Sequence, residues 1–179
     1  NLEDPWGMDV GFAVQMAFIF IDNAEGGYTD GLPGTNIKFS EEDAWDKVII
    51  LSPQTSARVK QECEAKAEAM MDAIVVPSRT TGRGRTITGS LKAADLGEGD
   101  PSTWGYQVVM QSNEGFPADM DLLTRKVNEY EGQHRFGGGT DYDCDPHVMD
   151  ILGDHSMLEF ECEADGSAKK MAVLKMVRQ

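Results

Sequence analysis

The stretch Gly11–Ile21, which reads GFAVQMAFIFI, decides the fold. It is apolar at nearly every position and rich in Phe, Val and Ile, which are favoured in β-strands. A strand that is apolar on both of its faces is typical of the centre of a sheet that is buried on both sides. The run ends at the turn cluster DNAEGG, residues 22–27. We therefore predict a central strand here, with the rest of the chain packed around it.

Short apolar runs bounded by Gly, Pro, Asp or Asn continue on the C-terminal side of this strand. They predict strands at Thr35–Phe39, Trp45–Leu51, Ile74–Val76, Arg83–Leu91, Tyr106–Gln111, Met157–Glu163 and Lys170–Val177, with Asp165-Gly166 as the hairpin turn between the last two. About nine strands with little helix predict an all-β fold, an antiparallel β-sandwich of the jelly-roll kind. We expect one domain over residues 1–179.

Three segments are harder to interpret. Ser56–Ala73 has the Ala, Glu and Lys content of a helix, but its apolar positions alternate, and from the alternation we predict a long strand. Asp145–Leu152 begins with Asp followed by Pro, which predicts a short helix with Asp145 as its N-cap. Asp121–Tyr130 fits either a short helix or a loop.

The charge balance excludes some classes of partner. Thirty-one Asp and Glu against sixteen Lys and Arg give a net charge of −15. Nucleic-acid binders and proteins that dock on anionic lipid gain affinity from clustered cations, so neither class is expected. The longest apolar stretch, Phe12–Ile21, is shorter than the ~20 residues that a membrane span needs. The chain has no starting Met and no signal peptide, and we expect it to be processed or cut from something longer.

Catalytic motifs are missing from the sequence. It has no GxSxG, HExxH or P-loop pattern, and we expect no enzyme activity. The Gly-rich run Arg135–Gly139 does not lead from a strand into a helix, so nucleotide binding is not expected. His147 and His155 flank the predicted helix but lack a clear third ligand for zinc. We expect them, like His134, to be ordinary histidines.

An acidic loop follows the glycines. Asp141, Asp143 and Asp145 stand at alternate positions, so in an extended segment their carboxylates would converge. Calcium accepts several carboxylate oxygens from an irregular loop, and we predict a calcium site there. The competing interpretation is a solvated turn in which Asp145 caps the helix.

Aromatic residues and cysteines supply two further hypotheses. Trp45, Trp104 and Tyr142 are candidates for stacking on sugar rings, although a place in the core is the alternative for each tryptophan. Of the three cysteines, we predict a Cys144–Cys162 disulfide and a buried free thiol at Cys63.

Four stretches together resemble a known family. They are NLEDPWGMDVGFAVQMAFIFIDN at residues 1–23, DGLPGTN at 30–36, WGYQVVMQSNEGF at 104–116 and RKVNEYEGQHRFGGGTDYDCDPHVMDILG at 125–153. In order and spacing they resemble the glucodextranase C-terminal domain family, over nearly the whole chain. The resemblance implies a β-sandwich similar to family 9 carbohydrate-binding modules and to DOMON domains. It also implies an exported or cell-surface setting and a non-catalytic accessory role toward a glycan or cell-surface polymer.

The chain departs from the family at its beginning. Family members usually carry further strands before the Pro-Trp-Gly segment, and here that segment comes almost first. We therefore expect one sheet edge to be covered by another chain or by residues that precede Asn1.

Two other functions stay open. Haem b electron-transfer subunits of molybdoenzymes use a related sandwich and hold haem through Met and Lys. Among the ten methionines, Met16 and Met110 fall on expected core strands. The other alternative is a structural subunit of a filament or lattice.

Overall fold

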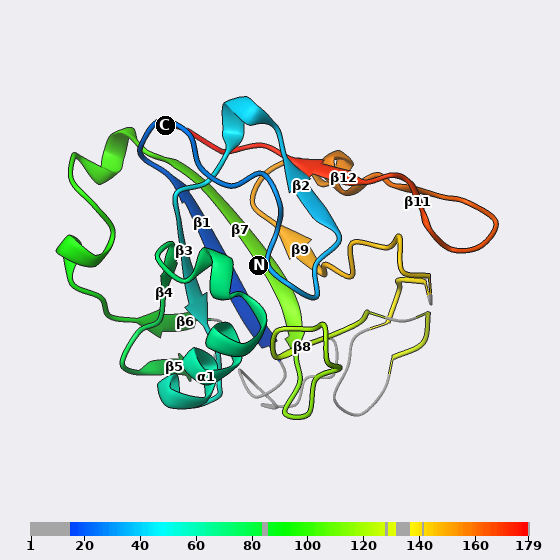
Figure 1. Ribbon diagram of the computed structural model, residues 1–179, viewed down its shortest axis with the longest axis horizontal. Coiled ribbons are helices and arrows are strands. Elements are labelled where there is room, and N and C mark those ends of the chain that lie inside the picture. Colours follow the sequence, from blue (N-terminus) through cyan, green and yellow to red (C-terminus); the bar gives the residue numbers. More distant parts are fainter. Residues whose placement is uncertain (1–14, 84–85, 128, 132–136, 141, 179) are drawn as a thin grey trace.

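The computed structural model describes the chain except for residues 1–14, 84–85, 128, 132–136, 141 and 179 (Figure 1). The described strands are β1 (Gln15–Asp22), β2 (Ile37–Phe39), β3 (Lys47–Leu51), β4 (Ile74–Val75), β5 (Thr80–Arg83), β6 (Thr86–Gly89), β7 (Gly105–Asn113), β8 (Thr124–Arg125), β9 (Asp150–Ile151), β10 (Glu161–Cys162), β11 (Ala168–Lys170) and β12 (Ala172–Leu174). This part of the chain has one α-helix, α1 (Ser56–Lys66), and the 3₁₀-helices η2 (Glu41–Asp43), η3 (Glu68–Met70), η4 (Ala93–Asp95), η5 (Pro101–Thr103) and η6 (His155–Leu158).

A six-stranded sheet forms the centre of the molecule. Its strand order is β4-β3-β1-β7-β8. β9 also pairs with β7, at Val109 and Met110, just before the residues of β7 that pair with β8. β1 is central, as predicted: Phe18 pairs with Ile50 of β3 on one side and with Val109 of β7 on the other. β3 and β4 run parallel and the other pairs of this sheet run antiparallel.

The two faces of β1 are buried in two different cores, because successive side chains of a strand point to opposite faces. Met16, Phe18 and Phe20 belong to the larger core, which the parallel β2–β12 pair and α1 cover. Burying one such side chain contributes about 1.5–3 kcal/mol. The layering confirms the predicted all-β, sandwich-like fold.

The smaller core lies on the opposite face. Ala17 and Ile21 pack there with Trp104, and Ile87 of β6 covers them. β5 and β6 form a separate antiparallel hairpin over this face. Both faces of the main sheet are therefore covered, which explains why the sequence of β1 is apolar throughout.

The strand predicted over Ser56–Ala73 is wrong, because its first eleven residues form α1. Thr55 Oγ1 caps the helix by accepting a hydrogen bond from the Arg58 N–H at 3.3 Å. Glu62 then forms ion pairs of 3.0 Å with both Arg58 and Lys66, each four residues away. Only Val59 and Cys63 of α1 are buried, and they too are four residues apart.

The helix predicted over Asp145–Leu152 is also wrong. His147 has a positive φ of 53°, which a continuing α-helix does not allow. The side chain of Asp145 still behaves as a cap, since its Oδ1 accepts a hydrogen bond from the His147 N–H at 2.7 Å, but the chain turns into β9 instead. The hairpin turn predicted at Asp165-Gly166 is confirmed between β10 and β11, where Gly166 has a φ of 84°.

The outer edges of the main sheet are β4 on one side and β8 with β9 on the other. The expected cover over a sheet edge stays a prediction, because residues 1–14 lie outside the described part.

Candidate functional site

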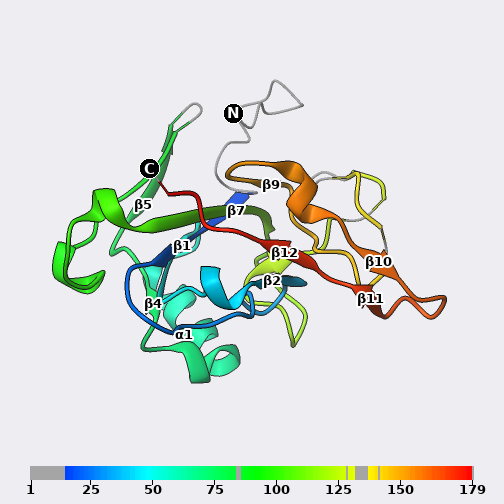
Figure 2. The ribbon, with the colours of Figure 1, turned by 90° about the horizontal axis from the view of Figure 1, so that it is seen from above.

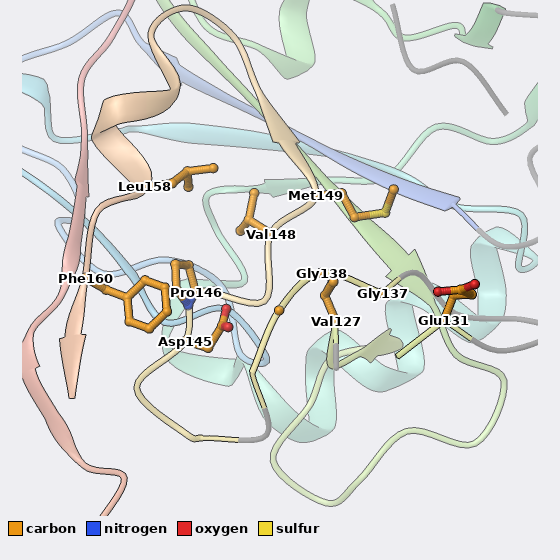
Figure 3. Close-up of a pocket in the computed structure, with 11 residues that line it drawn as sticks. Val127, Glu131, Gly137, Gly138, Asp145, Pro146, Val148, Met149, Leu158 and Phe160 are labelled. Atoms are coloured by element: carbon orange, nitrogen blue, oxygen red, sulfur yellow. The ribbon is translucent and has the colours of Figure 1, made fainter. Parts of the chain in front are cut away.

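A pocket of about 620 Å³ lies between the glycine run and the segment that leads into β9 (Figure 3). The side chains of Leu158 and Phe160 complete it from the η6–β10 region. The described residues of its lining are mostly apolar, with two carboxylates among them: Val127, Glu131, Gly137, Gly138, Gly139, Asp145, Pro146, Val148, Met149, Leu158 and Phe160.

The glycine run forms a wall of bare backbone. A Cβ on Gly139 would lie 1.8 Å from the Val127 carbonyl oxygen, and one on Gly137 would lie 2.5 Å from the Glu131 nitrogen. The two backbone segments therefore approach each other more closely than any side chain permits. The Gly138 N–H donates to the Glu129 carbonyl at 3.2 Å and holds the segments together. The same glycines leave the pocket with a smooth peptide surface on this side.

The side chain of Asp145 stabilises the wall of the pocket opposite the glycines through hydrogen bonds. Its Oδ2 accepts hydrogen bonds from the Thr140 N–H at 2.7 Å and the Thr140 hydroxyl at 3.1 Å, and its Oδ1 accepts from the His147 N–H. The residue is only 5% exposed. Both oxygens already have donors, so this carboxylate shapes the pocket rather than offering a free charge to a ligand.

His147 lies directly behind this wall. It is 1% exposed, and its backbone carbonyl accepts a hydrogen bond from Gln111 Nε2 of β7 at 3.3 Å. Burial lowers the pKa of the imidazole below its ordinary value, which leaves the ring neutral at neutral pH. A non-glycine residue at positive φ is costly, and such residues gather at binding sites. His147 therefore marks the pocket as a built feature of the fold.

Two exposed tyrosines come from the segments that build the pocket. Tyr130 is 69% exposed and directly precedes Glu131, and Tyr142 is 54% exposed and lies against Gly166 of the β10–β11 turn. Tyr142 was predicted as a sugar-stacking residue, and its exposure fits that role. The apolar lining was not predicted, because Val148, Met149, Leu158 and Phe160 carry no motif, although they follow the glycine run and the acidic loop that the sequence singled out.

The two tryptophans that were candidates for sugar stacking, Trp45 and Trp104, are core residues. Trp45 is completely buried in the larger core, where its ring packs 5.2 Å from that of Phe20 and its Nε1–H donates to the Asp30 carbonyl at 2.9 Å. Trp104 is 6% exposed and belongs to the smaller core. Neither ring presents a face to a sugar, so their alternative interpretation as core residues holds.

The acidic loop is a turn rather than an extended segment, so its carboxylates do not all point the same way. Asp143 reaches outward and pairs with Lys126, whose hydrogen bond and positive charge lower the pKa of Asp143 below its ordinary value. Asp145 points inward. Asp141 lies outside the described residues, and the described ones hold no group of three or more His, Cys, Asp or Glu that fits a metal ion. The calcium site remains a prediction, for which the melting temperature with calcium and with chelator is the measurement.

A disulfide joins this loop to the strand beside it. Cys144 and Cys162 are bonded, with their Cα atoms 5.6 Å apart, in the pairing expected from the sequence. Cys63 is a free thiol, completely buried on the inner face of α1, and burial raises its pKa to about 12.

The remaining expected residues are spread over the fold. Met16 lies in the larger core, whereas Met110, which pairs with Ala17, lies beside the smaller one, so the two thioethers are on opposite faces of the sheet. His155 is exposed and interacts with Asp150 at 2.7 Å, and His134 lies outside the described residues. No described helix is long and apolar enough to cross a membrane.

A family model described as the C-terminal, SLH-like binding module of glucodextranase matches residues 1–176. No curated protein matches the chain. The match covers the main sheet, both cores and every residue that lines the pocket.

Proposed function

Because the chain belongs to the family of glucodextranase C-terminal binding modules, we propose that it is a non-catalytic module that binds a neutral glycan. The observation that carries the proposal is the pocket with a backbone wall, an apolar lining and two exposed tyrosines from its supporting segments. The family consists of binding modules, not catalytic domains, and it is named after glucodextranase, which suggests an α-glucan such as dextran as the ligand.

The lining suits a sugar ring. A pyranose has apolar C–H faces and a rim of hydroxyls, and protein sites bind it with apolar or aromatic surface plus a few polar groups. Val148, Met149 and Phe160 offer the apolar surface. The glycine wall lets hydroxyls approach peptide groups, which donate and accept hydrogen bonds.

The charge of the lining favours neutral sugars. Its described residues include the carboxylates of Glu131 and Asp145 and no Lys, Arg or His. In a chain with a net charge of −15, an acidic sugar in this pocket would meet repulsion from these carboxylates. Neutral α-glucans are therefore the class of ligand that we propose for this site.

The setting we propose is extracellular or cell-surface, with an accessory role toward a glycan-acting or surface protein. The family supports it, and so does the Cys144–Cys162 disulfide, since such bonds persist in oxidising compartments.

Affinity electrophoresis tests the proposal. The wild-type chain should be retarded in gels that contain dextran, amylose or pullulan, and Tyr130→Ala and Tyr142→Ala should each weaken binding about five- to tenfold, as expected for the loss of one stacking ring. Phe116→Ala is the matched control: this ring is 91% exposed, but it lies on the β7–β8 loop, which Arg58 and Lys66 hold against α1. Wild-type mobility that none of these glucans changes would overturn the proposal.

A further inference from the structure

One segment is basic, although the chain as a whole is acidic. Residues 78–94 contain Arg79, Arg83, Arg85 and Lys92 and no Asp or Glu, although the chain has 31 acids. Without these four cations the net charge would move from −15 to −19. Since the acids are so abundant elsewhere, a stretch this free of them calls for a physical explanation.

This segment forms the β5–β6 hairpin, whose two faces differ. The cross-strand pairs Thr81–Thr88 and Arg83–Thr86 share one face, because directly opposed residues point the same way. All four of these residues are exposed. The other face carries Ile87, which packs on the smaller core, and Gly89, whose Cβ would lie 2.8 Å from the Leu51 side chain. The hairpin is therefore fixed to the body through one face and presents the other to solvent.

The outer face carries hydroxyls and guanidinium groups. Arg79 comes just before β5 and Ser90 just after β6, and by strand alternation both continue this face; both are exposed. In the described part of the chain neither Arg79 nor Arg83 forms an ion pair, whereas Arg58 and Arg178 do. Two unpaired guanidinium groups on a molecule this acidic are free to bind an anion.

We propose that this outer face, defined by Arg79, Thr81, Arg83, Thr86, Thr88 and Ser90, binds a linear acidic polysaccharide. A guanidinium binds a carboxylate through two parallel hydrogen bonds, and the hydroxyls between the arginines match a polyhydroxylated chain that lies across the strands. The spacing suits a polymer, because alternate strand residues repeat along one direction.

The size of the face argues against a second copy of the chain as the partner. A stable protein interface uses roughly 20–30 residues a side, and this face offers a small fraction of that. Nucleic acid is disfavoured because the face has no aromatic ring on which a base can stack and because the whole chain is acidic.

The face lies far from the pocket. β5 and β6 are on the left of the molecule in Figure 1, whereas β11 is on the right; Figure 2 shows from above that β5 is also separated from β10 and β11, which lie beside the pocket. The inference therefore stands apart from the proposed function: the pocket favours neutral glucans, and the hairpin favours acidic chains.

Affinity electrophoresis in gels with polygalacturonate tests the inference. The wild-type chain should be retarded, and Arg79→Gln/Arg83→Gln should weaken binding at least about tenfold, since both guanidinium–carboxylate contacts are lost. Added salt should weaken wild-type binding, as for any contact between exposed charges. The melting temperature and dextran binding should not change, because both side chains are exposed and remote from the pocket.

The matched control removes the same charge elsewhere. Lys169→Gln/Lys170→Gln also lowers the charge by two, on exposed residues of β11, and should leave polygalacturonate binding nearly unchanged. Equal loss in both double variants would overturn the inference in favour of a general charge effect. So would equal retardation by single-stranded DNA or polyglutamate. Self-association at low salt that only the arginine variant abolishes would identify a second copy as the partner instead.

Discussion

At the scale of single residues, Arg178 connects the C-terminal end of the chain to the main sheet. Its Nη1 donates to Asp43 Oδ1 at 3.0 Å, and its Nη2 binds Asp22 at the end of β1. Burial alone would raise the pKa of Asp43, but hydrogen bonds from Arg178, the Met176 N–H and Ser40 outweigh it and lower the pKa below its ordinary value. For Asp22, burial prevails over Arg178 and the pKa is raised. Arg178 therefore stabilises the charged form of both carboxyl groups.

This contact predicts a pH-dependent stability. A carboxyl group whose pKa is lowered by folding stabilises the fold above its unfolded pKa, about 3.9 for Asp, and the contribution is lost as the pH falls through the folded pKa. Arg178→Gln should lower the free energy of unfolding at pH 7 by about 1 kcal/mol, a value reduced for the partial exposure of the guanidinium. Without Arg178 the raised pKa of Asp22 rises further, which adds to the cost at pH 7. Urea denaturation should show the difference shrinking below about pH 4.

The control is Lys38→Gln, which removes an exposed ion pair with Asp30 and should change the free energy of unfolding very little at either pH. A difference between Arg178→Gln and the wild type that is the same at pH 7 and pH 3.5 would show that the carboxylates are not involved.

Residue type alone did not distinguish the exposed candidate site residues from those that are buried in the core. Tyr142 and Trp45 are both aromatic and both stand beside turns, yet Tyr142 is 54% exposed and Trp45 is completely buried. What separates them is packing from distant parts of the chain: Phe20 and Tyr28 enclose Trp45, and only the folded sheet brings these rings together. The buried thiol at Cys63 was predicted from the alternation of a strand, whereas it is buried because it shares the inner face of α1 with Val59.

At the scale of elements, local pattern predicted β1, β3, β4 and β7 of the main sheet, missed the two-residue strands β8 and β9, and failed where two signals competed. β1 was predicted because a run that is apolar on both faces has one plausible place in a β-protein. In Ser56–Ala73 the alternation came from small residues such as Ala57 and Ala65, which are exposed in the structure. Helix propensity, the Thr55 cap and the Arg58–Glu62–Lys66 ion pairs prevailed there.

The disulfide gives a prediction at this scale, because it ties the pocket loop to β10. Replacing both Cys144 and Cys162 by Ser should lower the free energy of unfolding by about 3 kcal/mol, the chain-entropy value for a sequence separation of 18. It should also weaken dextran binding, since the loop that holds Asp145 loses its covalent tether. Denaturation with and without a reducing agent checks this: the reductant should destabilise the wild type and leave the double variant unchanged.

Cys63→Ala is the comparison, because it leaves the disulfide in place. This variant should lose stability from packing alone and keep the response of the wild type to the reductant. A wild type that the reductant does not affect would contradict the assigned pairing.

At the scale of the whole molecule, charge is divided between two surfaces. The pocket, with its two carboxylates, lies beside β10 and β11, and the basic hairpin lies on the opposite side of the molecule (Figure 1). The main sheet connects them, since Ile87 of β6 packs on its smaller core while β9, which follows the pocket segment, pairs with β7. The neutral glucan and the acidic polysaccharide that we propose as ligands would therefore bind to separate surfaces of the chain.

This separation predicts that the chain links two glycans. Soluble dextran should be captured on polygalacturonate beads only when the wild-type protein is present, because one molecule then holds both polymers at once. Tyr130→Ala/Tyr142→Ala should lose the capture by releasing dextran, and Arg79→Gln/Arg83→Gln should lose it by releasing the protein from the beads. Each variant must keep its other partner, which identifies the surface that failed. Because neither surface overlaps the other, free dextran should not displace the protein from the beads; displacement would mean that both polymers share one site and that the molecule does not bridge them.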